Sequence, residues 1–343
     1  MAEAIVQDIT RDSHYVPRRT LRRWAADGRH VLAYRTLVPH EDFPIWSRYA
    51  IKSFGTERDL YTAVEGGDEA DSVEKWLTRE YEEPGQDAIE RLIERRRMVP
   101  DDWKRIARFV ALQQLRTPLN FLETTRRYET QLTESLEKVV RDLEEAGKAG
   151  QVLPVPTPES NFLADQMRIK VTPDTSEGTA FVAAQVSSSR AIWLATIRHH
   201  LIKNVPAICQ HRWRAILPAG DAEWPLTDHP VLTLNYDSPE RYDFRGGWGH
   251  EGTELIMPIS PRVAVYTQVK RKDRGFEPSV DQTAMLQRLM CERAFRWVIA
   301  RQPLPWLSTT FPREVDAARF KEEEHAWDSW NAIHSAAERE FGA

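Results

Sequence analysis

The stretch 109–118, FVALQQLRTP, places polar side chains on a helix face that is otherwise apolar. At 3.6 residues per turn the apolar stripe continues into Gln113 and Gln114, and Arg116 lies beside Phe109. A buried amide or guanidinium without a partner costs on the order of 1–3 kcal/mol, so partners must come from elsewhere in the chain. The pattern predicts either a buried polar network or a site in which these groups hold negative charge.

A second set of polar residues lies near the N-terminus, in the sequence His14-Tyr15-Val16-Pro17. The imidazole of His14 titrates near neutral pH, so it could act as a general base or as a metal ligand. Tyr15 stands next to it on a backbone that Pro17 restricts. The alternative is a histidine that lies at the surface or caps a turn.

The third set lies between Pro225 and Pro230, directly before an expected strand. Because a proline stiffens each flank, Asp228 and His229 have a fixed direction relative to the sheet. A carboxylate beside an imidazole at the start of a strand is a candidate catalytic or ligand-binding pair. Thr227 and Asp228 can instead satisfy turn amides with their own side chains.

Evidence for a metal centre is weak. His199 and His200 are adjacent, so on a helix they point about 100° apart, and Cys209 and His211 form an isolated pair. Structural zinc sites carry two ligand pairs at defined spacings, and the sequence has no such set. Walker, dinucleotide-binding, His-Glu-x-x-His and nucleophile-elbow sequences are also absent. The cofactor stays unknown, with a divalent metal left open.

Length, composition and net charge indicate which broad class of protein this sequence belongs to. A chain of 343 residues with 41% apolar residues and twelve Trp can bury a sizeable core. Its net charge of −5 creates no global basic field that would attract nucleic acid or an anionic membrane. The sequence has no signal peptide, no apolar run long enough to span a membrane, and only two cysteines. These features predict a soluble cytoplasmic protein.

The helices and strands that the sequence pattern indicates predict an α+β fold that is rich in helix. We expect helical character over about 71–203 and strands over about 206–270, within a single domain at 14–301. Residues 302–343 are expected to form an extension with one charged helix, whose Trp residues could bind a protein partner. The connector 151–160 is expected to be extended because Pro154, Pro156 and Pro158 alternate in it. A capping box at Ser279 and Gln282 predicts a helix that runs to Trp297. The expected strands, joined as a modest antiparallel sheet by both ends of the chain, are Val31–Thr36, Trp213–Leu217, Val231–Asn235, Leu255–Pro258 and Val263–Val269.

With these residues identified, the chain resembles the bacterial family known as domain of unknown function 4238. The likeness covers about residues 14–301 and follows the order of six blocks. They are HYVP with Leu21-Arg22-x-Trp24, RDLYT, Val73-Glu74-Lys75 with Glu80, FVALQQLRTP, LTDHPV, and PISP at 258–261. The fifth block usually reads Thr-Ser-Asp-x-Pro-Val in that family, so Leu226 and Thr227 depart from it while Asp228 is kept. The resemblance implies no established activity, although some members are suggested to belong to defence or accessory gene sets.

Two functions are compatible with these residues. If the polar groups converge, they suit hydrolysis or group transfer on an anionic small molecule or a nucleic acid, as in a phosphodiesterase or nuclease. In that interpretation the catalytic residues are His14, Gln113, Arg116 and Asp228, and the substrate-binding residues are Tyr15, Glu80, Gln114 and Thr227. Alternatively the protein is a non-catalytic binding or accessory protein. Arg116 then pairs with Asp228 in a structural network and His14 caps a turn.

Overall fold

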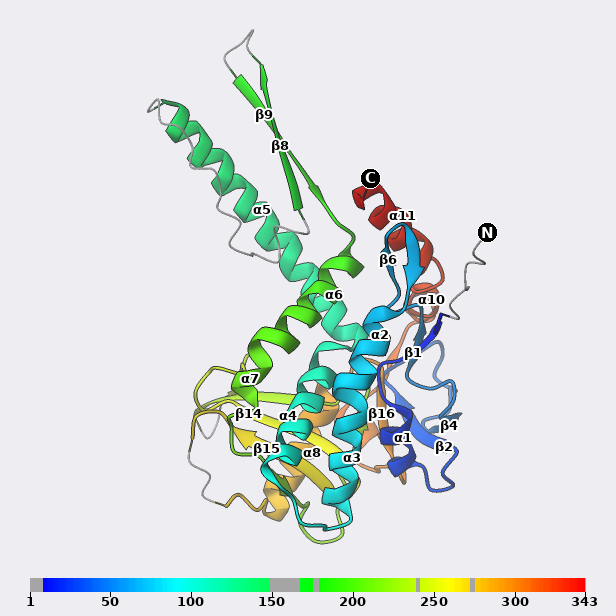
Figure 1. Cartoon of the computed structure of the whole chain (residues 1–343). Coiled ribbons are helices and arrows are strands. Elements are labelled where there is room, and N and C mark those ends of the chain that lie inside the picture. Colours follow the sequence, from blue (N-terminus) through cyan, green and yellow to red (C-terminus); the bar gives the residue numbers. More distant parts are fainter. Residues whose placement is uncertain (1–8, 149–166, 175–178, 239–240, 272–274, 343) are drawn as a thin grey trace, which may run out of the picture.

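The structure is a computed structural model that describes residues 9–148, 167–174, 179–238, 241–271 and 275–342. The expected proline-rich connector at 151–160 lies outside these ranges. The fold is α+β and rich in helix, as predicted (Figure 1). In the described part of the chain, no helix has both the length and the apolar character needed to cross a membrane.

The helical part lies mostly in the middle of the chain. Its central helix α4 begins where Pro100 takes the first helical position and Asp102 accepts a hydrogen bond from the Val99 amide at 3.0 Å. The π-helical turns η1 and η3 meet where the Tyr81 hydroxyl donates to the Leu201 carbonyl. The segments are α2 (Ser72–Leu77), η1 (Thr78–Glu82), α3 (Glu83–Ile93), α4 (Pro100–Leu115), α5 (Pro118–Lys148), α6 (Ser189–His199), η3 (His200–Asn204) and α7 (Val205–Ile208).

A hairpin interrupts this helical part, in contrast to the expectation for residues 71–203. Strands β8 (Met167–Asp174) and β9 (Thr179–Val186) pair in antiparallel register, with Val171 opposite Val182. Both strands are rich in β-branched residues, which favour a pleated conformation over a helix. Helix α5 and this hairpin project away from the rest of the molecule (Figure 1).

The larger sheet has five antiparallel strands in the order β10-β15-β14-β12-β13. It contains the four expected strands after Pro206, here β10 (Arg214–Ile216), β12 (Leu232–Ser238), β14 (Glu254–Ser260) and β15 (Val263–Gln268), together with β13 (Arg241–Asp243). Helix α8 (Val280–Glu292) packs Leu286 and Met290 against the buried residues of this sheet. Its capping box is present, but the helix ends at Glu292, so the prediction that it runs to Trp297 is wrong.

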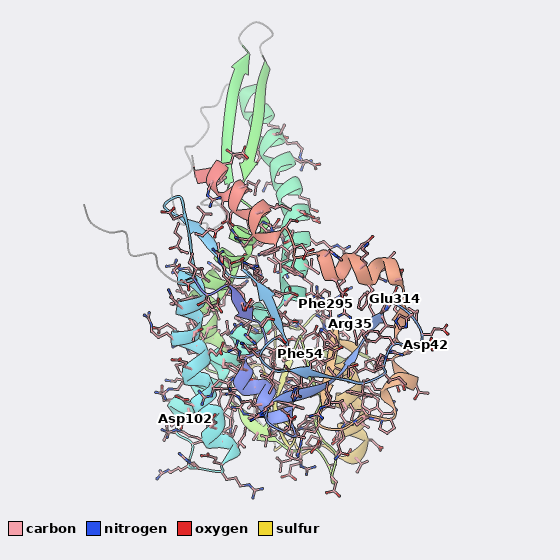
Figure 2. All side chains as sticks on the ribbon, turned by 90° about the vertical axis from the view of Figure 1, so that its right-hand side faces the viewer. Arg35, Asp42, Phe54, Asp102, Phe295 and Glu314 are labelled. Atoms are coloured by element: carbon pink, nitrogen blue, oxygen red, sulfur yellow. The ribbon has the colours of Figure 1, made fainter. Side chains whose placement is uncertain are left out.

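The second sheet joins the two ends of the chain. Its order is β11-β16-β2-β4, with β11 (Leu226–Thr227), β16 (Trp297–Ala300), β2 (His30–Arg35) and β4 (Ser47–Ala50). Val298 lies opposite both Tyr34 and Thr227, so β16 binds the N-terminal strand to the strand before Asp228. Figure 2 shows Phe295 and Arg35 close together beneath α10, a C-terminal helix at Ala317–His325. The expected sheet between N-terminal and C-terminal parts is therefore present.

Short elements complete the fold. Helix α1 packs beside this sheet, and its Trp24 indole donates to the Trp224 carbonyl at 2.9 Å in the main core. Strand β1 pairs with β5, β6 pairs with β7, and β3 runs parallel to β17. Their bounds are β1 (Asp12–His14), α1 (Arg18–Trp24), β3 (Leu37–Val38), β5 (Thr56–Arg58), β6 (Ala63–Glu65), β7 (Asp68–Ala70), α9 (Leu307–Thr310) and β17 (Glu314–Val315).

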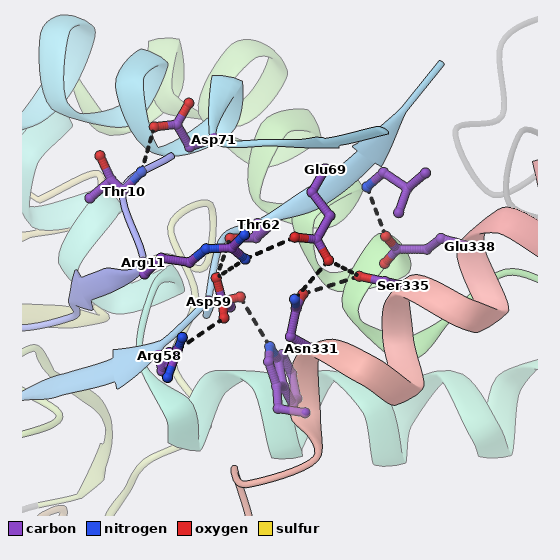
Figure 3. A network of polar contacts seen from close by, with 12 residues as sticks. Thr10, Arg11, Arg58, Asp59, Thr62, Glu69, Asp71, Asn331, Ser335 and Glu338 are labelled. Atoms are coloured by element: carbon purple, nitrogen blue, oxygen red, sulfur yellow. Dashed lines mark hydrogen bonds and ion pairs between the residues drawn. The ribbon is translucent and has the colours of Figure 1, made fainter. Parts of the chain in front are cut away.

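In the described part of 302–343 the short helix α9 is followed by two longer helices, α10 and α11 (Trp330–Gly342), where one helix was expected. The Trp330 ring is buried edge-on against Phe121, with 4.6 Å between ring centroids, and its indole donates to the Asp59 carbonyl. Polar side chains of α11 continue the contact to β7, where Asn331 and Ser335 donate to Glu69 (Figure 3). The extension thus packs into the domain, and a protein partner for it stays a prediction.

Candidate functional site

Arg116 lies at the corner between α4 and α5 with only 2% of its surface exposed. Its guanidinium forms an ion pair with Glu82 at 2.5 Å and donates to the Tyr61 hydroxyl at 3.2 Å and to the His14 carbonyl. The Tyr61 hydroxyl in turn donates to the Arg116 carbonyl at 2.6 Å. The expected pairing of Arg116 with Asp228 is wrong, because Glu82 on η1 supplies the carboxylate. These contacts fix the position of the backbone where α4 ends and α5 begins.

His14 and Tyr15 lie beside this corner, and the His14 imidazole is partly buried. The His14 Nε2 lies 3.1 Å from the Arg18 Nε and 3.4 Å from the Ile51 carbonyl oxygen. Burial lowers the pKa of His14, and the Arg18 charge acts in the same direction. Tyr15 is 2% exposed, and burial raises its hydroxyl pKa, with the nearby Asp228 charge adding to the effect. The N-terminal block is therefore close to both other sets of predicted residues.

Asp228 follows β11 directly and is 2% exposed. One carboxylate oxygen accepts the Phe295 amide at 2.9 Å and the other accepts the Arg296 amide at 2.8 Å. Burial raises the Asp228 pKa to about 6, while the two backbone N–H groups oppose that rise. The carboxylate thus holds the chain just before β16 begins at Trp297.

The neighbours of Asp228 link this strand to the helical corner. The Thr227 hydroxyl donates to the His229 carbonyl at 2.8 Å, and the His229 Nδ1 is 2.9 Å from the Thr117 hydroxyl. The same Thr117 oxygen accepts the Asn120 amide in the first turn of α5. Burial lowers the pKa of His229 to about 3, so the imidazole is neutral. Hydrogen bonds through His229 and Thr117 therefore connect the segment after β11 to the first turn of α5.

Gln113 lies within the same core, fully buried on α4. Neither its amide nitrogen nor its amide oxygen has a hydrogen-bond partner in the described chain. Such an amide costs on the order of 1–3 kcal/mol. We have no physical account of why the fold keeps it.

Gln114 points about 100° away from Gln113 around α4 and bridges two parts of the structure. Its amide nitrogen donates to the Thr233 hydroxyl at 3.0 Å, and its amide oxygen accepts the indole N–H of Trp248 at 2.8 Å. The Trp248 carbonyl also bonds to the His211 imidazole at 2.9 Å. These contacts attach the loop Gly247–Gly249 to α4 and to the larger sheet.

Trp248 forms one side of a cleft of about 460 Å³, here called the Trp248 cleft. The cleft lies where the end of α4 and the start of α5 meet α6, η3 and α7. Its volume lies within the range of about 300–1,000 Å³ that is typical of small-molecule sites. The lining residues are Gln114, Leu115, Asn120, Thr124, Arg127, Thr196, His200, Lys203, Asn204, Ala207, Gly247, Trp248 and Gly249.

The Trp248 cleft favours negative charge. It contains the cations Arg127 and Lys203, and among its lining residues in the described chain there is no Asp or Glu. The Asn204 amide nitrogen lies 2.6 Å from the His200 Nδ1; because an amide nitrogen donates, the His200 proton is on Nε2. Burial lowers the pKa of His200, and the nearby His199 and the Arg127 charge act in the same direction. His200 is therefore a neutral N–H donor in a positive environment.

Glu80, the remaining predicted substrate-binding residue, lines a different cleft of about 840 Å³ between η1, α4 and α7. Its carboxylate pairs with Arg79 at 2.9 Å, and Asp101 in the same cleft pairs with Arg105 at 2.8 Å. The structure thus brings His14, Tyr15, Arg116 and Asp228 into one region. Gln114 lies in the Trp248 cleft and Glu80 lies elsewhere.

No group of three or more His, Cys, Asp or Glu side chains in the described residues has the arrangement of a metal centre. Cys209 and Cys291 are both free thiols, and burial raises the pKa of each.

Sequence reasoning missed most of the Trp248 cleft. His200 is considered above only as a possible metal ligand, and Arg127 and Lys203 are not among the candidate residues. One signal was available in Gly246-Gly247-Trp248-Gly249, because a Trp between glycines has no helix or strand face to pack on. Such a residue is a candidate for binding rather than for the core.

Comparison with known proteins agrees with the motif blocks. The family model described as "Protein of unknown function (DUF4238)" matches residues 13–303. No curated protein and no solved structure matches the chain. Because the match spans most of the 343 residues and includes every motif block, the chain belongs to the DUF4238 family.

Proposed function

We propose that this protein binds an anionic small molecule in the Trp248 cleft. The observation that carries the proposal is the composition of the cleft wall, where Arg127, Lys203 and the N–H donor His200 face no lining carboxylate among the described residues. Hydrogen bonds to a charged group are worth about 1.5–3 kcal/mol each, so such a wall favours a phosphate or carboxylate over a neutral ligand.

In this proposal the buried cluster around Arg116 and Asp228 supports the cleft. Arg116 fixes the corner between Leu115 and Asn120, which both line the cleft. Thr117 ties the same corner to His229 and thereby to the second sheet. The cluster is therefore a structural network, which is the non-catalytic interpretation of the motif residues.

Titration with inorganic pyrophosphate, followed by calorimetry and by NMR of labelled protein, tests the proposal. We expect the single substitutions Arg127→Gln and Lys203→Gln each to weaken pyrophosphate binding about tenfold, which corresponds to about 1.4 kcal/mol. Arg198→Gln, an exposed cation of α6 outside the cleft, is the matched control and should change the affinity less than about twofold. Binding that is absent, or that all three variants weaken equally, contradicts the proposal.

Hydrolysis or group transfer on an anionic substrate is the second candidate, with His14, Gln113, Arg116 and Asp228 as the acting groups. What favours it is the proximity of these groups, because Arg116 donates to the His14 carbonyl, and burial raises the pKa of Asp228 to about 6, a value suited to a general acid or base. Turnover of phosphodiester substrates that Asp228→Asn abolishes, with the unfolding free energy unchanged, supports this candidate. Loss of turnover only in parallel with loss of folded protein contradicts it.

A further inference from the structure

We infer that the ligand of the Trp248 cleft carries a planar ring as well as its anionic group, as a nucleoside monophosphate does. This inference rests on the proposed function and adds the class of ligand. In it the ring lies against the indole of Trp248, and the phosphate lies toward Arg127 and Lys203.

Trp248 is partly buried: it packs against the main core and also lines the Trp248 cleft. Its indole N–H is bonded to Gln114 and its carbonyl to His211, so both the ring and the backbone are fixed. A rigid aromatic ring loses little conformational entropy when a second ring stacks on it, and such stacking is worth about 1–3 kcal/mol per base.

The two glycines that flank Trp248 lie in open space. A methyl group built on Gly249 would meet no atom within 4 Å, and one on Gly247 would meet only the His250 Cβ at 3.9 Å. Neither glycine needs the left-handed backbone conformation, so the turn itself does not require them. The backbone on either side of Trp248 therefore lies in open space, which leaves the segment accessible to a ligand.

His200 connects the aromatic part of the cleft to its charged part. Its ring meets the Trp248 ring edge-on, with 6.0 Å between centroids, and Arg127 is close enough to act on its charge. After His200 the chain continues through η3 into α7. Lys203 and Ala207 are four residues apart there, so they share one face, and both line the cleft. A ligand that spans Trp248 and the two cations needs both a ring and an anion.

Three probes separate the parts of this inference: adenosine 5′-monophosphate, adenosine and inorganic phosphate. We expect the monophosphate to bind at least about tenfold tighter than either of the others, because it contacts both parts of the cleft. On its addition the indole N–H signal of Trp248, assigned by its loss in Trp248→Phe, should shift. Affinities are also measured for guanosine, cytidine and uridine monophosphates and for phenyl phosphate, because the cleft could prefer a ring other than adenine.

Two variants of Trp248 test the role of the ring. Trp248→Leu should weaken binding of the ring-bearing phosphate about tenfold and leave inorganic phosphate within about twofold. Trp248→Phe keeps a ring, so it should retain most of the affinity. If the leucine variant fails to fold, the phenylalanine variant still tests whether a ring is sufficient for binding. Lys203→Gln should weaken both ligands.

The outcomes separate this inference from the proposed function. If none of the ring-bearing phosphates binds tighter than inorganic phosphate, while Lys203→Gln still weakens phosphate binding, the inference about the ring is wrong and anion binding stands. If pyrophosphate, phosphate and every ring-bearing phosphate all fail to bind, both are wrong. If adenosine binds as tightly as the monophosphate and Lys203→Gln has no effect, the anionic part is wrong, and the proposed function with it.

Discussion

Glu338 on the last helix is bonded at both carboxylate oxygens to the fully buried Arg190 on α6. The Arg190 Nε donates to one oxygen at 2.9 Å and Nη2 donates to the other at 2.7 Å, and the Glu338 side chain is 6% exposed. The same carboxylate accepts the Ser188 hydroxyl and the Val64 amide, so it joins α11, α6 and β6. Glu338 lies beyond residue 303, where the family match ends.

Glu338→Gln is therefore expected to lower the free energy of unfolding by about 3–5 kcal/mol, because it leaves the buried Arg190 charge without its partner. Urea denaturation measures the change. The matched control is Asp101→Asn, which breaks the exposed ion pair with Arg105 and should cost less than about 1 kcal/mol. Equal effects of the two substitutions would mean that α11 is not part of the cooperative fold.

Asp228→Ala is expected to cost roughly 2–6 kcal/mol, because it removes the acceptor of two buried backbone N–H groups. Hydrogen exchange gives a local measure: the Phe295 and Arg296 amides should exchange faster in the variant than other amides of the same sheet. Asp221→Ala, at an exposed turn, should stay within about 0.5 kcal/mol of the wild type. Unchanged exchange at Phe295 and Arg296 would exclude the anchoring role.

Gln113→Met is expected to raise the free energy of unfolding by about 1 kcal/mol, because it replaces an unbonded buried amide with an apolar group of similar shape. Gln287→Met makes the same exchange at a bonded amide, since the Gln287 nitrogen donates to the Glu223 carbonyl at 2.8 Å. That control should destabilise the protein. Destabilisation by Gln113→Met as well would show that the Gln113 amide is bonded in solution.

His229 should make the fold sensitive to acid. The folded protein keeps His229 neutral down to about pH 3, whereas an unfolded chain protonates the imidazole near pH 6.5. Because the unfolded state then binds more protons, this stabilising contribution is full above pH 6.5 and is lost as the pH falls toward 3. From pH 7 to pH 5 the loss is about 2 kcal/mol.

Urea denaturation of the wild type and of His229→Gln at both pH values isolates this effect. The glutamine can still bond to Thr117 but does not titrate, so the stability difference between the two proteins should shrink by about 2 kcal/mol at pH 5. Asp228 acts in the opposite direction between its ordinary pKa of 3.8 and its folded pKa of about 6. It is present in both proteins, so its contribution cancels. A difference that does not change with pH contradicts the buried neutral state of His229.

The regular elements of the fold were largely predictable from local patterns. Alternating residues indicated β14 and β15, and the capping residues Ser279 and Gln282 marked the start of α8. Its end was missed because the strand conformation of Trp297 comes from pairing with Arg35, more than 200 residues away in sequence. The β8–β9 hairpin was missed because its short alternation lies between two long helices.

For the candidate site, too, some features follow from the sequence and others only from the tertiary structure. The sequence by itself determined that Gln113, Gln114, Arg116 and Asp228 are polar groups in apolar surroundings that need partners. Only the tertiary structure decided those partners, giving Glu82 to Arg116 and the backbone of Phe295 and Arg296 to Asp228. The reason is physical: helical and strand periods depend on neighbouring residues, whereas a buried polar group takes whichever partner the packing of distant segments brings within hydrogen-bond distance.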